Sequence, residues 1–344
     1  MLSSRFPYAS AFFVLALYVS FVCGCDSTEP AQRPSSDKNV ESSSDSTAVN
    51  ENVGSDWQPE RVDSDHLPNA YRLTEKVISG GLPEDADAFQ ELANLGVKTI
   101  ISVDGAQPDI ELAHRFGLRY VHLPHGYDGV PESRAEELAK AVLELDGPIY
   151  IHCHHGKHRS PAAATVACVG AGFLSPNVAI NVLQTAGTSE HYKGLYASAR
   201  EAHPFDRLLL EQLSVEFAES VKVPPMAEAM VEIEHTFDRL KLVRESNWQV
   251  PERHPDVVPA HEALMLREHF TELLRTKEVD NYDANFRSLL QQSEQAAENL
   301  EGLLRETGDG RSLSDIKAAY ESLASDCKSC HRQYRDAPRS AARK

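Results

Sequence analysis

The residues of this chain best suited to do chemistry are a cysteine and an arginine six positions apart, Cys153 and Arg159. They lie in the stretch HCHHGKHRS, residues 152–160. With Gly156 between them, a loop of this length can curl so that its backbone N–H groups and the guanidinium converge on one tetrahedral anion beside the thiol. The spacing therefore predicts an anion-binding loop in which the cysteine reacts as a thiolate.

The loop is predicted to connect a strand to a helix. An apolar segment at residues 147–151 precedes it, and an Ala-rich segment follows it. Ser160 suits the N-cap position and Pro161 the first helical position, so the helix dipole would point at the same anion. The positions expected to contact a bound anion are His154, His155, Gly156, Lys157, His158 and Arg159.

The pattern His-Cys-x-x-Gly-x-x-Arg-Ser resembles the signature of the cysteine-dependent tyrosine and dual-specificity phosphatases. SGGLP at residues 79–83 and LGVKTIISV at residues 95–103 are similar to the compact atypical dual-specificity phosphatases, including those that act on inositol phosphates. This resemblance covers about residues 66–190. It implies an enzyme that hydrolyses phosphotyrosine, phosphoserine or phosphothreonine in proteins, or a compact phosphate ester such as an inositol phosphate.

The resemblance also implies a reaction in two steps. Cys153 would attack phosphorus and become a phosphocysteine, which water then hydrolyses. Arg159 and the loop amides would hold the phosphoryl oxygens through the transition state. Ser160 would help the thiolate to leave, and His152 would orient the loop.

Departure of the alkoxide needs a general acid on a neighbouring loop. Asp128, flanked by glycines in HGYDG (residues 125–129), is the first candidate. Glu132 is the second, with a helix-capping role as its alternative, and Asp104, which ends the preceding strand, is the third. Cys168, in the helix after the loop, is expected to be a packed core residue.

A second chemical site is the C-x-x-C-H sequence formed by Cys327, Cys330 and His331. This is the attachment pattern of c-type haem. The cysteines would form thioethers to the porphyrin, and the histidine would be the proximal ligand of the iron. Both cysteines continue the helical rhythm of Tyr320 and Leu323, which predicts that they face a core. Zinc or a disulfide at the two cysteines is the alternative.

The stretch CKSCHRQYR, residues 327–335, resembles the cytochrome c′ and cytochrome c-556 family, over about residues 226–336. In that family the second side of the iron is open or filled by a methionine. Met226 and Met230 are the candidates here, and the alternative is that both are core residues. The expected partners at the haem are NO or CO, or a redox partner, and a dimer formed through the helical bundle is a further expectation.

These motifs predict a multidomain chain. Between residues 57 and 222, apolar β-branched runs such as VKTIISV (residues 97–103) alternate with helical segments. Alternation of this kind predicts an α/β phosphatase domain with a parallel sheet and helices on both faces, and it places Cys153 at the carboxyl ends of the strands. Residues 223–344 show helical periodicity, which predicts a four-helix bundle, and Ser312 with Asp315 resembles a capping box for its last helix.

The N-terminus predicts export. Residues 1–25 combine a basic start with an apolar run, residues 11–22, that is short for a membrane span. The run ends in VCGC, which resembles a bacterial lipobox with Cys25 as the lipidated residue; secretion without lipid or an uncleaved anchor is the alternative. Residues 26–56 are polar and predict a disordered linker. The expected location is the bacterial periplasm, at the membrane.

The net charge of the chain excludes one class of function. Lys and Arg number 34 against 52 Asp and Glu, a net charge of −18, which is too acidic for a general nucleic-acid binder. An anionic substrate must therefore be captured by a local basic pocket. We expect an exported, lipid-anchored phosphatase fused to a haem c bundle. The alternative is a haem-based gas or redox sensor, or an electron-transfer protein, whose phosphatase-like domain is regulatory or only binds phosphorylated ligands.

Overall fold

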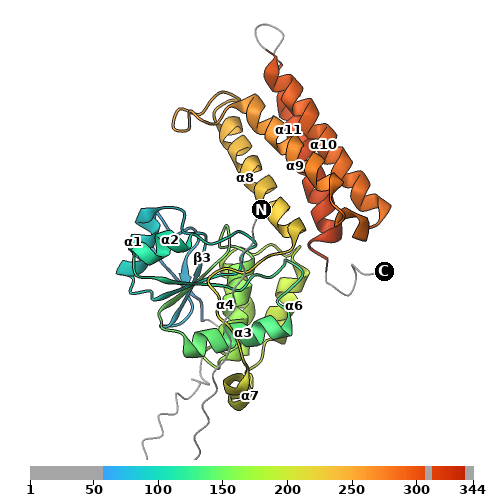
Figure 1. The fold of residues 1–344 in the computed structure, drawn as a ribbon. Coiled ribbons are helices and arrows are strands. Elements are labelled where there is room, and N and C mark those ends of the chain that lie inside the picture. The colour runs from blue at the N-terminus through green and yellow to red at the C-terminus, as the bar shows by residue number, and fades with distance from the viewer. Residues whose placement is uncertain (1–56, 307–311, 338–344) are drawn as a thin grey trace, which may run out of the picture. The chain divides into compact units, whose positions relative to one another are not determined.

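A six-stranded sheet organises the N-terminal part of the chain in the computed structural model (Figure 1). The structure describes residues 57–306 and 312–337. The strands follow the order β1-β2-β3-β6-β4-β5. Their bounds are Glu60–Arg61 (β1), Tyr71–Arg72 (β2), Val77–Gly80 (β3), Thr99–Ser102 (β4), Arg119–His122 (β5) and Ile149–His152 (β6). Strand β6, which leads into the Cys153 loop, lies at the centre of the sheet.

Strands β3, β6, β4 and β5 are parallel, as the sequence predicts. The two edge strands β1 and β2 are antiparallel, which the sequence reasoning missed. Only residues 73–76 join β2 to β3. A link of that length can make a hairpin but cannot hold the crossover helix that a parallel pair needs. The sheet is therefore mixed, with a parallel centre.

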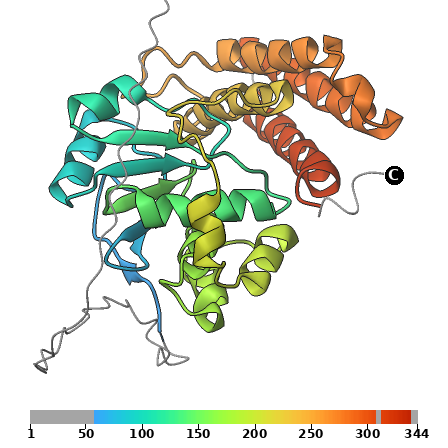
Figure 2. The same cartoon turned by 60° about the horizontal axis from the view of Figure 1, so that its bottom comes forward.

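Helices cover both faces of the sheet, as expected for an α/β domain. Helices α1 (Ala86–Asn94) and α2 (Ile110–Arg115) pack on one face, where Ile100 is buried. Helices α3 (Glu132–Glu144), α4 (Arg159–Gly170), α5 (Ala179–Thr185) and α6 (Lys193–Glu201) cover the other, where Ile101 is buried. Because successive strand residues point to opposite faces, the apolar runs supply both cores at once. Figures 1 and 2 show the two helical layers.

Two helices of this region were not predicted. They are α6 and α7 (Arg207–Gln212). A short 3₁₀ helix, η1 (Pro176–Val178), lies directly before α5. Helix α6 contains Gly194, a residue that disfavours helix in isolation. Its formation depends on the burial of Leu195 and Ala199 against the sheet's second core.

The C-terminal region is a helical bundle built from α8 (Pro225–Glu245), α9 (Pro259–Arg275), α10 (Ala284–Arg305) and α11 (Leu313–Tyr334), with the 3₁₀ helix η2 (Val279–Asn281) between α9 and α10. Helix α10 packs against α9 and α11, and α8 packs against α9. The Asp315 N–H donates to the hydroxyl of Ser312, as the predicted cap requires. The four-three stripes on these helices meet in one apolar core that includes Leu240, Leu300 and Leu323.

A charge pair with a buried carboxylate joins two bundle helices. Glu262 on α9 is almost fully buried, and Arg239 on α8 donates to both of its carboxylate oxygens, at 2.8 and 2.9 Å. A carboxylate in an apolar core is stable only when it is paired. This pair therefore fixes the register of α8 on α9.

The predicted export signal (residues 1–25), its Cys25 and the predicted linker (26–56) lie outside the described residues. Among the helices that the structure describes, none is long and apolar enough to cross a membrane. The described residues all fall within one unit, residues 48–344.

The bundle core makes a stability prediction. Leu323 on α11 is fully buried, whereas Leu313 on the same helix is 46% exposed. Leu323→Ala should lower the free energy of unfolding by about 2–5 kcal/mol, because it leaves a cavity. Leu313→Ala is the matched control and should change it by less than about 0.5 kcal/mol. Urea unfolding followed by circular dichroism measures both; equal losses would contradict the assigned core.

Candidate active site and haem-binding residues

The Cys153 loop lies at the carboxyl end of β6, between the ends of β3 and β4. Cys153 follows the strand directly and is 2% exposed. The loop ends where α4 begins, at Arg159. In open parallel sheets this edge is where ligands bind.

Glycines allow the loop its close turn. Gly156 has φ +70°, and a Cβ there would lie 2.5 Å from the Gly81 nitrogen and 2.6 Å from the Gly80 carbonyl carbon. The loop is held from the same side by Leu82, whose N–H donates to the carbonyl of His154 (3.0 Å). The amide of Asn69 donates to the Gly156 carbonyl (2.9 Å). The glycine pair in SGGLP therefore makes room for the loop, and Asn69 is a positioning residue that the sequence did not reveal.

Contrary to the prediction, Ser160 is not the N-cap of α4. The helix begins at Arg159, and its N-cap is His158, which makes no side-chain cap hydrogen bond. The Ser160 hydroxyl points back into the loop instead. It lies 3.3 Å from Cys153 Sγ and donates to the Gly80 carbonyl (2.9 Å). If the thiol ionises, a rotation of this hydroxyl away from Gly80 lets it donate to the thiolate.

Arg159 is buried beside Cys153 and held by two groups. Its Nη2 lies 2.9 Å from Asp104 Oδ2, and both side chains are less than 10% exposed. Its guanidinium stacks over the Tyr127 ring, 4.4 Å from the centroid. Its Nε is buried, and no side chain or backbone group that the structure describes accepts a hydrogen bond from it. A buried donor without an acceptor costs about 1–3 kcal/mol, which an anion oxygen would recover.

Asp104 is a partner of the loop rather than a proton donor. Its Oδ2 also accepts from the His154 N–H (2.6 Å), and its Oδ1 accepts from the Gly105 N–H (2.6 Å). Burial alone would raise the pKa of Asp104, but Arg159 and these N–H groups hold that pKa well below its usual range. A carboxylate held ionised cannot act as the general acid, so Asp104 does not suit the role considered for it.

His152 ends β6, and its Nε2 lies 2.7 Å from the hydroxyl of Tyr120 on β5. Burial lowers the pKa of His152 to about 4, so the ring is neutral near pH 7. A neutral, buried ring with a fixed partner fits the orienting role expected for this residue.

Asp128 lies in the loop after β5 and is held by α6. A Cβ added at Gly126 would lie 2.4 Å from Asp128 Oδ1. A Cβ added at Gly194 of α6 would lie 2.0 Å from the carbonyl oxygen of Asp128. The Val130 N–H donates to the hydroxyl of Ser198 on α6 (2.9 Å). The unpredicted helix therefore positions the first candidate acid. Glu132, the second candidate, is the first residue of α3 and is exposed.

The basic side chains of the loop have different surroundings. Lys157 and His155 are exposed, whereas His158 packs against Tyr192, with ring centroids 4.5 Å apart. Burial and the neighbouring cations lower the pKa of His158 to about 4, so it is neutral. His154 Nε2 lies 3.2 Å from a carboxylate oxygen of Asp238 on α8. Among these basic side chains, the buried positive charge beside Cys153 is that of Arg159.

The two cysteines of the C-x-x-C-H sequence lie on α11 and are not joined by a disulfide. Cys330 is buried in the bundle core and Cys327 packs against it, on the same side as Leu323. Burial raises the pKa of both thiols to about 11. Burial, with Arg335, lowers the pKa of His331 to about 3, which leaves the neutral imidazole that binds iron. This donor set fits a c-type haem.

Residues 275–335, which include these three donors, match the family described as Cytochrome C′. A cytochrome c′ domain is present. It implies that this part of the chain binds haem. No curated protein matches the chain.

Three of the solved structures to which the chain is similar are the following. P. aeruginosa TpbA in complex with pTyr is 23% identical, covering 42% of this chain and 90% of that chain, with TM-score 0.37. A second TpbA structure is 23% identical, with coverages of 45% and 94% and TM-score 0.38. A protein from Shewanella putrefaciens CN-32, described as a candidate phosphatase (DUF442), is 18% identical, with coverages of 41% and 96% and TM-score 0.35.

Met226 and Met230 lie on α8, outside the residues that match the Cytochrome C′ family, and are partly buried against the core that contains Cys330. Helix α8 also meets α11 where the rings of Phe237 and Tyr320 stack, 5.2 Å apart. Both methionines therefore pack as core residues do, on the helix from which a second iron ligand was expected.

Burial of His152 predicts a pH dependence. Its pKa falls from 6.5 to about 4 on folding, so between these pH values the unfolded chain binds a proton that the folded chain does not. Stability is unaffected above pH 6.5 and declines as the pH falls toward 4, by about 3 kcal/mol for this group. His152→Gln should flatten the pH dependence of urea unfolding, while His191→Gln, at an exposed position, should not. Parallel curves for all three proteins would contradict the assignment.

Proposed function

We propose that this chain is an exported phosphatase that hydrolyses phosphate monoesters through a phosphocysteine intermediate and carries one covalent haem c. The observation that carries the reaction is the Arg159 guanidinium, which is buried beside Cys153 with its Nε lacking an acceptor among the described residues. A phosphoryl oxygen supplies both the missing acceptor and the negative charge that such a site stabilises.

The first step forms the thiophosphate bond. The Cys153 thiolate attacks phosphorus, and the bond from phosphorus to the ester oxygen breaks. Asp128 gives its proton to the departing alkoxide. Arg159 and the loop N–H groups hold the phosphoryl oxygens, which carry the charge of the transition state.

The second step returns the free enzyme. Asp128, now ionised, takes a proton from a water molecule that attacks phosphorus, and the sulfur–phosphorus bond breaks. The leaving thiolate is stabilised by the Ser160 hydroxyl, which lies 3.3 Å from Cys153 Sγ. The products are inorganic phosphate and the alcohol. The proposed substrates are phosphotyrosine or phosphoserine/threonine in a protein, or an inositol phosphate.

The haem of the proposal would be held by thioethers to Cys327 and Cys330, with His331 on the iron. Bound there, it would supply an iron that binds a gas such as NO or CO, or exchanges an electron with a redox partner. Attachment of c-type haem takes place outside the cytoplasm, which agrees with the export signal predicted for residues 1–25. Within the proposal, Cys25 carries the lipid that anchors the protein to the membrane in the periplasm, and a dimer would form through the bundle.

Replacement of the nucleophile tests the proposal. Cys153→Ser should abolish hydrolysis of p-nitrophenyl phosphate and still bind phosphate esters, because Arg159 and the loop amides remain. Cys168→Ser is the matched control, since Cys168 is fully buried in the core and burial raises its pKa to about 12. Retention of more than a few per cent of the wild-type rate in Cys153→Ser would place the chemistry elsewhere. Wild-type binding without turnover would favour the alternative, a domain that only binds phosphorylated ligands.

The acid is tested by the leaving group. Asp128→Asn should slow alkyl phosphate esters by about 100-fold or more, in line with the usual contribution of general acid catalysis. It should slow p-nitrophenyl phosphate much less, because that phenolate scarcely needs a proton. Glu132→Gln is the control and should affect both substrates little. Equal losses for both substrates in Asp128→Asn, with a selective loss in Glu132→Gln, would move the role to Glu132.

Covalent attachment is tested by extraction. Protein matured with the c-type attachment machinery should keep its haem through acid–acetone, and Cys327→Ser/Cys330→Ser should release it. With the methionines as core residues, the ferrous iron should be high-spin and bind CO. A low-spin ferrous spectrum that becomes high-spin in Met230→Leu or Met226→Leu would show a methionine ligand instead. Extractable haem in the wild-type protein would contradict the thioethers.

A further inference from the structure

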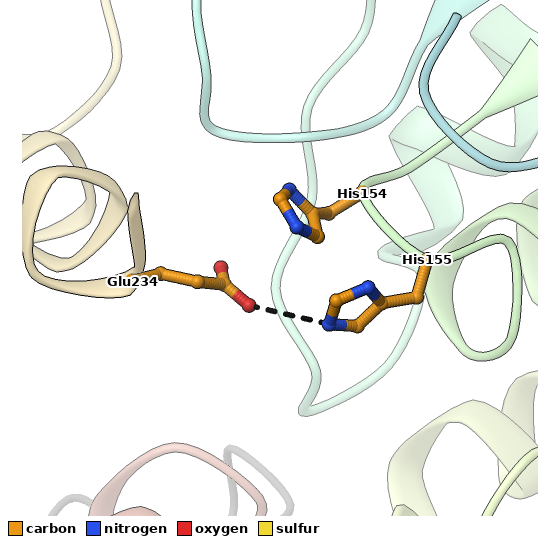
Figure 3. A group of neighbouring side chains, drawn as sticks. All are labelled: His154, His155 and Glu234. Atoms are coloured by element: carbon orange, nitrogen blue, oxygen red, sulfur yellow. Dashed lines mark ion pairs between the residues drawn. The ribbon is translucent and has the colours of Figure 1, made fainter. Parts of the chain in front are cut away.

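Three potential metal ligands meet where helix α8 faces the Cys153 loop. They are His154 and His155, the first two residues after the cysteine, and Glu234 of α8 (Figure 3). One ligand atom from each lies within 4.8 Å of the other two. His155 Nε2 is 3.6 Å from a Glu234 carboxylate oxygen, and the two imidazole centroids are 4.3 Å apart.

We propose that His154, His155 and Glu234 bind one transition-metal ion, such as Zn²⁺, which joins helix α8 to the Cys153 loop and slows phosphate-ester turnover. Two imidazoles and one carboxylate form a recognised donor set for this class of ion, with the fourth position left for water or another ligand. The slowing of turnover rests on the proposed phosphatase function; the binding of the ion does not.

Neighbouring groups support the geometry. Asp238, one turn after Glu234 on α8, lies 3.2 Å from His154 Nε2 and also pairs with Lys241. Its carboxylate can serve as the fourth ligand or accept from a bound water. His154 is 14% exposed and His155 46% exposed, so an ion can reach the cluster from solvent while one ligand is held in place by packing.

A second cluster on the described residues is a weaker candidate. His66, Asp85 and Asp87 also come within reach of one another, but all three are exposed. His66 and Asp85 are 4.0 Å apart at their nearest atoms, and Asp85 already caps α1 by accepting from the Ala88 N–H. Exposed acidic groups of this kind commonly occur without an ion, so this cluster serves as a control.

The expected inhibition follows from the hydrogen bonds of the loop. In the structure the His154 N–H donates to Asp104 Oδ2, and the same oxygen pairs with Arg159. Arg159 can meet a phosphoryl group through its Nε while it stays paired with Asp104, but the His154 N–H would have to turn from Asp104 to the phosphoryl group. An ion that fixes the His154 and His155 side chains to α8 stabilises the arrangement in which the His154 N–H stays on Asp104. Substrate must then compete with the ion for the loop.

Equilibrium dialysis of the full-length, haem-loaded protein against buffered ZnCl₂ tests the binding, with zinc and iron counted by mass spectrometry. We expect one zinc per chain. Glu234→Gln should weaken zinc binding by about tenfold or more, since even outer partners of metal ligands contribute about 10- to 100-fold to affinity. Glu232→Gln, an exposed glutamate on the same helix, is the matched control and should bind as the wild type does. Cys153→Ser should retain the zinc, which separates this site from the thiol.

Turnover of p-nitrophenyl phosphate tests the proposed inhibition by zinc. Zinc should inhibit the wild type and Glu232→Gln at the same concentration, and Glu234→Gln should need about tenfold more zinc. Equal zinc affinity in Glu234→Gln and Glu232→Gln, or a loss caused by His66→Ala instead, would overturn the site. Zinc bound at the site without inhibition would overturn the regulatory role. Zinc binding by a protein with no turnover at all would leave the site standing and contradict the proposed function.

Discussion

The burial of one positive charge constrains the rest of the α/β domain. Arg159 lies in the first turn of α4 with almost no exposure, so its guanidinium must be paired. Asp104 provides the pair from the end of β4, and Tyr127 provides an aromatic face from the loop after β5. Three strand ends are therefore brought together around one side chain. The same arrangement leaves Nε ready for an anion beside the Cys153 thiol.

Local sequence predicts what depends on local spacing. The Cys153 loop, the central strand before it and the C-x-x-C-H face of α11 all follow from short patterns, and the structure places them as those patterns indicate. The pairing of Asp104 with Arg159, 55 positions later, depends on two strand ends meeting and cannot be seen in either segment. The support of Asp128 by Gly194 was missed for the same reason, together with α6 itself. The Ser160 hydroxyl could reach either the first amides of the helix or Cys153, and the local sequence does not indicate which of the two it contacts.

The aromatic ring of Tyr127 is shared by two cations. Arg159 lies over it at 4.4 Å and Arg335 at 4.3 Å. Arg335 follows α11, and its N–H donates to the carbonyl of His331, the expected iron ligand (2.9 Å). Its guanidinium also donates to the Tyr192 hydroxyl (3.1 Å). Arg335, which follows α11, and Arg159 of the Cys153 loop thus both contact the ring of Tyr127.

In the proposed reaction, Cys153 becomes covalently phosphorylated. Mixing the haem-loaded protein with p-nitrophenyl phosphate, quenching it in acid within the first turnovers and digesting it for mass spectrometry measures this directly. We expect one phosphoryl group on the peptide that contains Cys153. Its yield should rise in Asp128→Asn, because hydrolysis of the intermediate then lacks its base. Turnover without a phosphoryl group on that peptide, or with one on a different residue, would contradict the proposed reaction.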